Sequence, residues 1–156
     1  MLTRVPDDMA YVVERLGRYH RTLAAGTHFL TPLFDRVAFR HVLRPRAVET
    51  SDVAISLDNV AVSVRSAFQW RIVDPRKASY EVADVAAHVA GLFRTRQREW
   101  IGRHAWKDVR ETTRQLESDV ARAIAEEASR VGVELVDVSV QHVERAGEGG
   151  LPVVYV

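Results

Sequence analysis

The sequence predicts an α+β fold, in which an antiparallel sheet of several strands is followed by two to three helices and a return strand. Three observations carry this prediction. Apolar and polar side chains alternate through much of the first half of the chain, apolar side chains recur every three or four residues between 84 and 130, and alternation returns at 133–143. A period of two is typical of strands, and a period near 3.6 is typical of helices. Strands that come first and helices that come afterwards indicate α+β architecture.

Three early strands are predicted at 11–16, 27–30 and 37–43. Each is a short β-rich stretch, and a glycine or a proline follows each of them. Both residue types interrupt regular strands, so these stretches are expected to be separate strands joined by turns.

The clearest alternation runs from 52 to 72 and is interrupted at Asp58-Asn59. Before the interruption, Val53, Ile55 and Leu57 alternate with polar or small residues. After it, the apolar side chains expected on one face are Val60, Val62, Val64, Phe68, Trp70 and Ile72. This pattern predicts two half-buried antiparallel strands. Because aspartate and asparagine both tolerate positive φ, we predict a two-residue hairpin turn at Asp58 and Asn59.

Three helices are predicted from capping residues and apolar spacing. One begins at Asp74-Pro75, because aspartate caps free amides and proline suits the first helical position. A second begins at Asp84 and ends near Gly102, and a third runs from about 113 to 130.

The return strand at 133–143 follows Gly132 and changes its apolar face near Leu135, which predicts a bulge or a twist at that point. The domain organisation expected from these elements is an N-terminal arm at 1–10, one compact domain at 11–144, and a glycine-containing linker with an apolar C-terminal tail at 145–156.

The composition is that of an ordinary globular chain with no charge surplus. The 156 residues carry a net charge of +1, 47% are hydrophobic, and none is cysteine. This near-zero charge argues against a nucleic-acid partner. The longest apolar run, LPVVYV at 151–156, is far shorter than the roughly 20 residues that a membrane span needs. We therefore expect the chain itself to be soluble, and any membrane association to be peripheral.

No catalytic, cofactor-binding or metal-binding residues are expected. The six histidines include no pair in a His-Glu-x-x-His motif, and the sequence contains no Gly-x-Ser-x-Gly motif and no glycine-rich phosphate loop. The pattern therefore predicts a protein that is not an enzyme.

A basic stretch at 94–110 holds six basic and two acidic residues, for a net charge of +4. The next stretch, 111–130, holds three basic and five acidic residues, for a net charge of −2. Three interpretations stay open: a solvated face with local ion pairs, pairing between neighbouring subunits, and contact with anionic lipid headgroups. The candidate contact residues are Arg94, Arg98, Arg103 and Lys107.

Four segments together resemble one protein family. They are VVERLGR with GTHFLTPLFDRV at 12–37, LDNVAVSV at 57–64, VDPRKASYEV at 73–82, and GVELVDVSV at 132–140. In this order they resemble the SPFH or Band 7 (PHB) domain of stomatins, prohibitins and flotillins, and bacterial stomatin-like proteins (slipins) in particular. The resemblance covers most of the chain.

The resemblance implies a non-enzymatic scaffold that self-associates at a membrane surface and organises membrane microdomains or a membrane protease partner. It also implies an apolar anchor before the domain and a helical coiled-coil segment after it, and this sequence shows neither. Only weak homo-oligomers are therefore expected. Gln97 stands where leucine is common in the family, which makes subunit contacts less certain than the fold.

A second function fits the same sequence. The chain would then be a soluble interaction module without a membrane anchor, binding a protein partner through a strand edge or through its C-terminal tail. The tail LPVVYV could add a strand to its own sheet, pair with another chain, or enter a groove that reads apolar C-termini.

Overall fold

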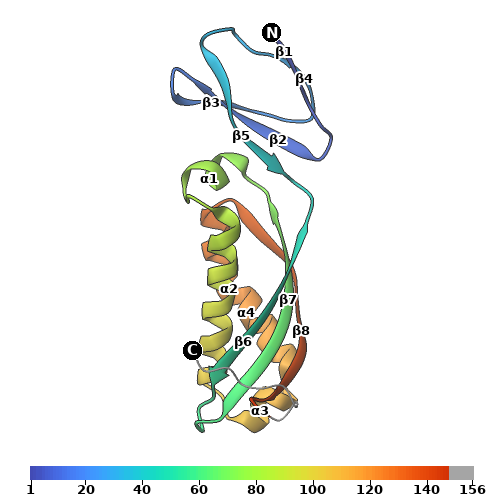
Figure 1. The fold of residues 1–156 in the computed structure, drawn as a ribbon, viewed down its shortest axis with the longest axis vertical. Coiled ribbons are helices and arrows are strands. Elements are labelled where there is room, and N and C mark those ends of the chain that lie inside the picture. The colour runs from blue at the N-terminus through green and yellow to red at the C-terminus, as the bar shows by residue number, and fades with distance from the viewer. Residues whose placement is uncertain (148–156) are drawn as a thin grey trace.

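The computed structural model describes residues 1–147, so the predicted C-terminal tail lies outside the described residues. The chain forms two lobes (Figure 1). The N-terminal lobe contains β1 (Leu2–Val5), β2 (Met9–Arg15), β3 (Arg18–Leu23), β4 (Gly26–Phe29) and β5 (Asp35–Val42). The second lobe contains β6 (Arg46–Ile55), β7 (Ala61–Ile72), α1 (Pro75–Tyr80), α2 (Val85–Gly102), α3 (Trp106–Glu111), α4 (Thr113–Arg130) and β8 (Val133–Arg145). The predicted α+β class is confirmed.

All strand pairs are antiparallel. The N-terminal lobe has a two-stranded sheet, β1-β4, and a three-stranded sheet of order β3-β2-β5. Residues 1–10, expected to form an arm, contribute β1 and the first residues of β2. The second lobe has one sheet of order β6-β7-β8, so β6 and β8 are its edge strands.

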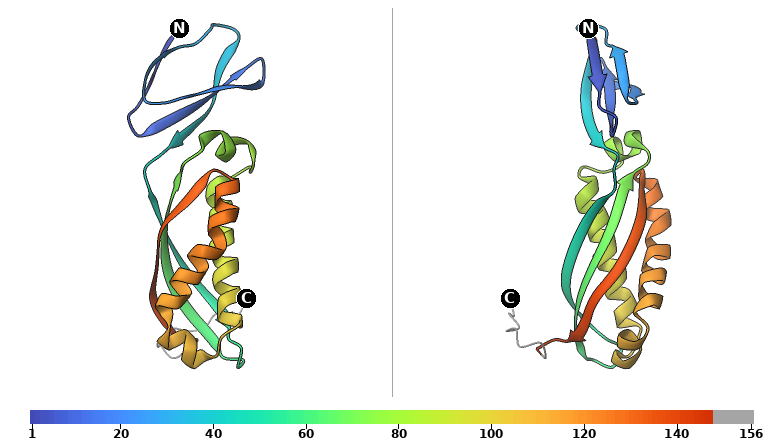
Figure 2. Two further views of the ribbon diagram at one scale, coloured as in Figure 1. Left: turned by 180° about the vertical axis from the view of Figure 1, so that it is seen from behind. Right: turned by 90° about the vertical axis from the view of Figure 1, so that its right-hand side faces the viewer.

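The molecule is elongated, with the N-terminal lobe at one end and α3 at the other (Figure 1). The helices α2 and α4 lie on the same face of the β6-β7-β8 sheet (Figure 2). The main core lies between them and the inward face of β7, where Phe68 stacks on Phe93 of α2 with ring centroids 4.5 Å apart. The predicted inward face of β7 is confirmed, because Val62, Val64, Phe68, Trp70 and Ile72 are all buried.

The predicted helix starts at Asp74 and Asp84 are confirmed. Each aspartate is an N-cap whose carboxylate accepts a hydrogen bond from a backbone N–H three residues later. The irregularity predicted in the return strand, a bulge or a twist, is observed as a bulge. Trp70 pairs with Leu135 and Gln69 pairs with Asp137, so Val136 is the extra residue and is exposed.

The orientation of β6 differs from the expectation that its larger apolar residues are buried. Val53, Ile55 and Leu57 are exposed, whereas Ala54 is buried. Pairing explains the difference, because residues directly opposite in a sheet point to the same face, and Ala54 lies opposite the fully buried Val62. The end of α2 also lies close to this strand. A Cβ at Gly102 would stand 3.7 Å from the carbonyl oxygen of Ile55, which is an ordinary van der Waals contact, so the helix packs directly against the backbone of β6 here.

The hairpin between β6 and β7 is not the predicted two-residue turn. Ser56 N donates to Val60 O at 2.9 Å, which leaves Leu57, Asp58 and Asn59 in the loop, and only Asn59 of these has a positive φ, 65°. Three-residue hairpin loops of this kind need one left-handed residue. The sequence also missed α3. The loop is fastened to the start of that helix, because Trp106 N donates to the Asp58 carboxylate at 3.0 Å.

Substitution of Asn59 tests this turn. Glycine at position 59 should leave the thermal midpoint almost unchanged, since glycine adopts positive φ without strain. Valine should lower the free energy of unfolding by about 1–2 kcal/mol, because its branched Cβ opposes the left-handed conformation. Equal thermal midpoints for Asn59→Gly and Asn59→Val would contradict the turn described here.

The unusual Gln97 has a partner inside the core. Its side chain is buried, and its Oε1 accepts a hydrogen bond of 2.5 Å from the hydroxyl of Ser66, which is also buried on β7. A polar pair of this kind is tolerated in a core only while both members are present.

A double-mutant cycle measures the pair. Ser66→Ala alone should lower the free energy of unfolding by about 1–2 kcal/mol, because it leaves a polar oxygen buried without its donor. Ser66→Ala combined with Gln97→Leu should recover most of that loss. Urea unfolding of the four proteins reports the coupling, and purely additive effects would show that the two side chains do not depend on each other.

Candidate interaction surfaces

The four basic residues predicted from the sequence do not form one patch. All four are exposed. Arg94 and Arg98 lie on α2, and the Arg94 guanidinium stands 3.7 Å from the Asp52 carboxylate of β6. Arg103 follows the last residue of α2, and Lys107 lies on α3. The four side chains therefore point to at least two different surroundings, β6 and the end of the molecule that holds α3.

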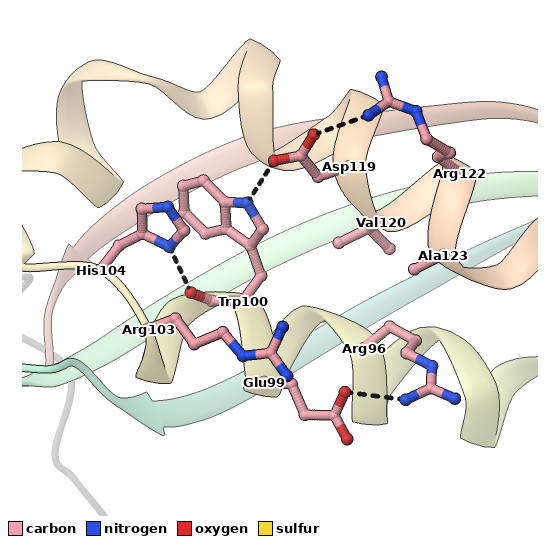
Figure 3. A pocket seen from close by; sticks show the side chains of 9 residues that line it. All are labelled: Arg96, Glu99, Trp100, Arg103, His104, Asp119, Val120, Arg122 and Ala123. Carbon is pink, nitrogen blue, oxygen red and sulfur yellow. Dashed lines mark hydrogen bonds and ion pairs between the residues drawn. The ribbon is translucent and has the colours of Figure 1, made fainter.

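A hollow of about 340 Å³ lies between α2 and α4 (Figure 3). Its floor is the indole of Trp100, on which the ring of His104 stacks at a centroid distance of 3.8 Å. The indole Nε1 donates to the Asp119 carboxylate at 2.9 Å, and His104 Nδ1 donates to the Trp100 carbonyl at 2.7 Å. The hydrogen bonds from Trp100 and then from Gln115 lower the pKa of Asp119. The hollow is thus a preorganised aromatic and charged surface, with Arg103 at its rim.

Some charged residues of the basic stretch 94–110 and the acidic stretch 111–130 form ion pairs within the chain. Arg96 of α2 forms ion pairs with Glu99 and with Glu127 of α4, and these pairs raise the pKa of Arg96. Asp119 of α4 is engaged by Trp100 and, at 3.7 Å, by Arg122. The acidic side chains facing α2 are therefore already occupied.

Several basic residues of α2, α3 and α4 have no acidic partner in the described part of the chain. Within residues 1–147, no carboxylate lies within ion-pair distance of Arg98, Arg103, Lys107 or Arg114. A partner that binds here would supply negative charge.

Exposed apolar side chains gather in the N-terminal lobe, and sequence reasoning did not single them out. Leu16 lies in the β2–β3 turn, and its N–H donates to Phe34 O at 3.1 Å. Leu33 precedes Phe34 in the β4–β5 connection, and Leu2 pairs with Phe29 between β1 and β4. All five side chains are at least half exposed, and Leu33 is 99% exposed. We call these five residues the apolar tip.

Two residues of the apolar tip have a strained backbone conformation. Leu16 and Leu33 adopt positive φ angles of 53° and 72°, a conformation that leucine rarely adopts. Such strain persists only where the surrounding structure imposes it, and it is common at binding sites. The sequence signal was present in GTHFLTPLFDRV, where large apolar residues flank a proline in a predicted turn.

The loop behind the tip is held by Asp35. Its carboxylate accepts hydrogen bonds from Arg15 Nε at 2.6 Å and from the backbone N–H of Thr31 at 2.8 Å. The hydrogen bond from Arg15, followed by that from Thr31, holds the pKa of Asp35 far below its usual range. The tip is thereby fixed to the end of β2.

A few side chains join the two lobes. Tyr80 of α1 donates its hydroxyl hydrogen bond to Glu14 of β2 at 3.0 Å, and the pKa of Tyr80 is raised by burial and by that carboxylate. His41 Nε2 of β5 lies 2.7 Å from the Ser79 hydroxyl. Because that hydroxyl donates to the Pro75 carbonyl, the histidine is the donor to Ser79.

Between residues 1 and 147, every helix is too short or too polar to cross a bilayer. In the same range, His, Asp and Glu side chains nowhere gather in a group of three or more that could hold a metal ion.

Comparison with known proteins gives the family. The model of the SPFH domain / Band 7 family matches residues 3–147. An uncharacterised protein of Schizosaccharomyces pombe is 38% identical over 130 residues, covering 83% of this chain and 37% of its own length. The human protein named stomatin-like protein 2, mitochondrial, is 34% identical, covering 83% of this chain and 36% of its own. A stomatin-like protein of Caenorhabditis elegans is 30% identical, covering 90% of this chain and 44% of its own.

The chain thus spans less than half the length of these curated relatives. Its match to the family model nevertheless extends across both lobes, from the second residue of β1 to the residues after β8. The chain belongs to the SPFH domain / Band 7 family.

Proposed function

We propose that this chain is a non-enzymatic scaffold domain that self-associates at a membrane surface and organises membrane microdomains or a membrane protease partner. Stomatin-like proteins are among its relatives, and the family is known for membrane-associated scaffolds. The observation that carries the proposal is the apolar tip, which gives this chain its own means of touching a bilayer.

The tip has the properties of a shallow membrane insertion. Soluble proteins rarely expose several large apolar side chains side by side without a partner surface. Apolar side chains with nearby basic ones bind the interface of anionic bilayers, where the chains enter the acyl boundary and the cations remain with the headgroups. Arg18 is exposed two residues after Leu16, and the Arg21 guanidinium donates to the carbonyl of Phe29.

The apolar tip and the exposed basic residues near α3 lie at opposite ends of the molecule. The β1–β4 pair and the β4–β5 connection lie at the end of the molecule farthest from α3 (Figure 1). A bilayer that touches the tip is then far from Arg103 and Lys107. We therefore propose that these two residues, with Arg98, face a protein partner or a neighbouring copy, and that lipid contact belongs to the tip.

Vesicle flotation tests the proposal. The full chain is mixed with vesicles of phosphatidylcholine and phosphatidylserine, and the bound fraction is compared with that of the Leu33→Ser/Phe34→Ser variant. Because the transfer of one such side chain from water stabilises by about 1.5–3 kcal/mol when complete, the variant should bind at least about tenfold more weakly. Both residues are exposed, so the fold should be unaffected.

The matched control is Val53→Ser/Leu57→Ser, which removes two exposed apolar side chains from the other lobe. This variant should float like the parent protein. Equal loss in both variants would mean that the chain adsorbs without orientation, and the proposal would then be wrong. Absence of binding by the parent protein would favour the alternative of a soluble interaction module that binds through the edge strands β6 or β8.

A further inference from the structure

A second cleft, of about 580 Å³, lies where the two lobes meet. One wall is formed by Gly17 of the β2–β3 turn and by Arg18 and Tyr19 at the start of β3. The helix α1 forms the other wall, on which Arg76 and Lys77 lie. The volume falls in the range typical of sites for small molecules. Neither the apolar tip nor the hollow between α2 and α4 includes these residues.

The cleft concentrates cations that have no carboxylate partner. Across residues 1–147, neither Arg18, Arg76 nor Lys77 forms an ion pair with an aspartate or a glutamate. Two acidic residues also line the cleft. The carboxylate of Asp74 accepts the backbone N–H of Lys77 at 3.2 Å as the cap of α1, and Glu81 is exposed at the end of the same helix. The lining therefore carries one more positive than negative charge.

The guanidinium of Arg76 is held in place by the ring of Tyr19. Its guanidinium carbon lies 4.2 Å from the centroid of the Tyr19 ring. A guanidinium that packs over an aromatic face keeps the N–H groups at its edge available, and it has already lost part of its rotational freedom. Fixed arginine donors with a lysine nearby are the usual partners of phosphate oxygens, which accept two parallel N–H bonds.

We propose that this cleft binds a phosphate group, contacted by Arg18 from the N-terminal lobe and by Arg76 and Lys77 from the second lobe. The bound anion then fastens the two lobes to each other. The two lobes share no sheet, and the hydrogen bonds described above at Glu14 and His41 are the main polar links between them. An anion that bridges Arg18 and Arg76 adds a link that is present only when the ligand is bound.

Calorimetric titration tests the site. The full chain is titrated with inorganic phosphate and with glycerol 3-phosphate at constant ionic strength, and chloride is the reference anion. Arg18→Gln and Arg76→Gln/Lys77→Gln should each weaken binding at least about tenfold, because each removes charge-assisted hydrogen bonds to the anion. Glu81→Gln should strengthen binding, because it removes a negative charge from the lining.

The matched control is Arg98→Gln/Lys107→Gln, which removes one arginine and one lysine that are equally unpaired but belong to the other end of the chain. This variant should bind phosphate like the parent protein. Equal weakening in the two double variants, or the lack of a saturable signal, would overturn the proposal. Arg18→Gln guards against a folding defect, because within residues 1–147 the Arg18 side chain forms no hydrogen bond, ion pair or ring contact, whereas Arg76 packs on Tyr19.

The source of the phosphate is a separate question with its own measurement. Vesicles of phosphatidylcholine with phosphatidic acid present a phosphate monoester at the bilayer surface, and vesicles with phosphatidylserine do not. If a lipid headgroup fills the cleft, Arg76→Gln/Lys77→Gln loses preference for phosphatidic acid and retains binding to phosphatidylserine. If the ligand is a free phosphate compound, Arg76→Gln/Lys77→Gln floats like the parent with both vesicles but binds glycerol 3-phosphate weakly. The tip variant Leu33→Ser/Phe34→Ser keeps the titration signal in either case, so failure of the membrane proposal and failure of the cleft are distinguishable.

Discussion

Replacement of Gly132 by alanine is expected to lower the free energy of unfolding by about 3 kcal/mol or more. Gly132 has a φ of +76°, which costs a residue with a Cβ about 1–2 kcal/mol. A Cβ at this position would also stand 2.3 Å from the carbonyl oxygen of Asp74 and 3.0 Å from the Cβ of Lys77. The second distance involves a side-chain atom next to the backbone, and the first involves the backbone itself, so neither neighbour can rotate away.

The backbone around Gly132 cannot shift to relieve the contact. Its carbonyl oxygen accepts hydrogen bonds from the N–H of Val73 at 2.8 Å and from that of Asp74 at 3.1 Å. These two bonds join the end of β7 to the start of β8. A shift that makes room for a methyl group would break them and displace α1, whose N-cap is Asp74.

Urea unfolding checks this prediction, with Gly91→Ala as the control. Gly91 lies inside α2, and a Cβ there would meet no atom within 4 Å. Alanine at position 91 should therefore stabilise the protein by up to about 1 kcal/mol, because alanine is the better helix former. Similar midpoints for the two alanine variants would contradict the close packing at Gly132.

The starts of α1 and α2 were predictable because their signals are local, whereas α3 follows Ala105 without a side-chain cap and was missed. The carboxylates of Asp74 and Asp84 each reach a backbone N–H only three residues away, so the cap and its helix occur in one short stretch of sequence. The turn after α4 is similar, since Gly132 alone meets its conformational requirement. No information from the other half of the chain is needed for these elements.

The face of β6 was not predictable from its own alternation. The alternation in β6 predicts that Val53 and Ile55 are buried. The register against β7 instead places Ala54 on the inner face and both larger residues on the outer face. Register depends on a partner strand and on the space beneath α2, and neither is visible in the β6 sequence. The prediction of a two-residue loop between β6 and β7 was wrong for the same reason. The length of this loop depends on contacts of Leu57 and Asp58 with the segment that begins α3.

The candidate interaction surfaces were also predictable only in part, because they depend on contacts between distant residues. The sequence identified the surplus of basic residues, but which of them are free depends on ion pairs such as Arg96 with Glu127, which are 31 residues apart. The apolar tip combines β1, the β2–β3 turn and the β4–β5 connection, so it exists only after the N-terminal lobe has folded. Spacing rules within one element cannot detect a patch of that kind.

Replacement of Asp35 by asparagine is expected to destabilise the N-terminal lobe more than any other substitution of a single polar residue in that lobe. The Asp35 carboxylate receives both Nε and Nη2 of Arg15, at 2.6 and 3.1 Å, together with the N–H of Thr31. Its side chain is fully covered, and asparagine would leave the Arg15 guanidinium without its counter-charge. The core cluster of this lobe consists of only four buried apolar residues, with Ala10 and Val12 buried outside it, so the lobe has little other stabilisation to offset the loss.

The pH dependence of this effect has a definite sign. The pKa of Asp35 is lowered in the folded state by the hydrogen bond from Arg15, with that from Thr31 second, whereas in the unfolded chain it is near the ordinary value of about 3.9. A lowered folded-state pKa means that the stabilisation is fully present above the unfolded value and is lost as the pH falls toward the folded value. The difference between the parent protein and Asp35→Asn should therefore be constant near neutral pH and should narrow below about pH 4.

Hydrogen exchange of backbone amides in β2 and β5, measured at pH 7 and again at pH 3, reports the lobe directly. All three tryptophans lie in the second lobe, so their fluorescence gives an independent measure of that lobe in the same samples. The control is Asp8→Asn, which removes an exposed ion pair with Arg44 and should change exchange little, since such pairs contribute little to stability. If Asp35→Asn exchanges like Asp8→Asn at neutral pH, the Arg15–Asp35 pair does not hold the loop that carries Leu33 and Phe34. If instead β2 and β5 exchange faster while the tryptophan signal is unchanged, the lobe that carries the apolar tip opens on its own, and the carboxylate of Asp35 is what keeps it closed.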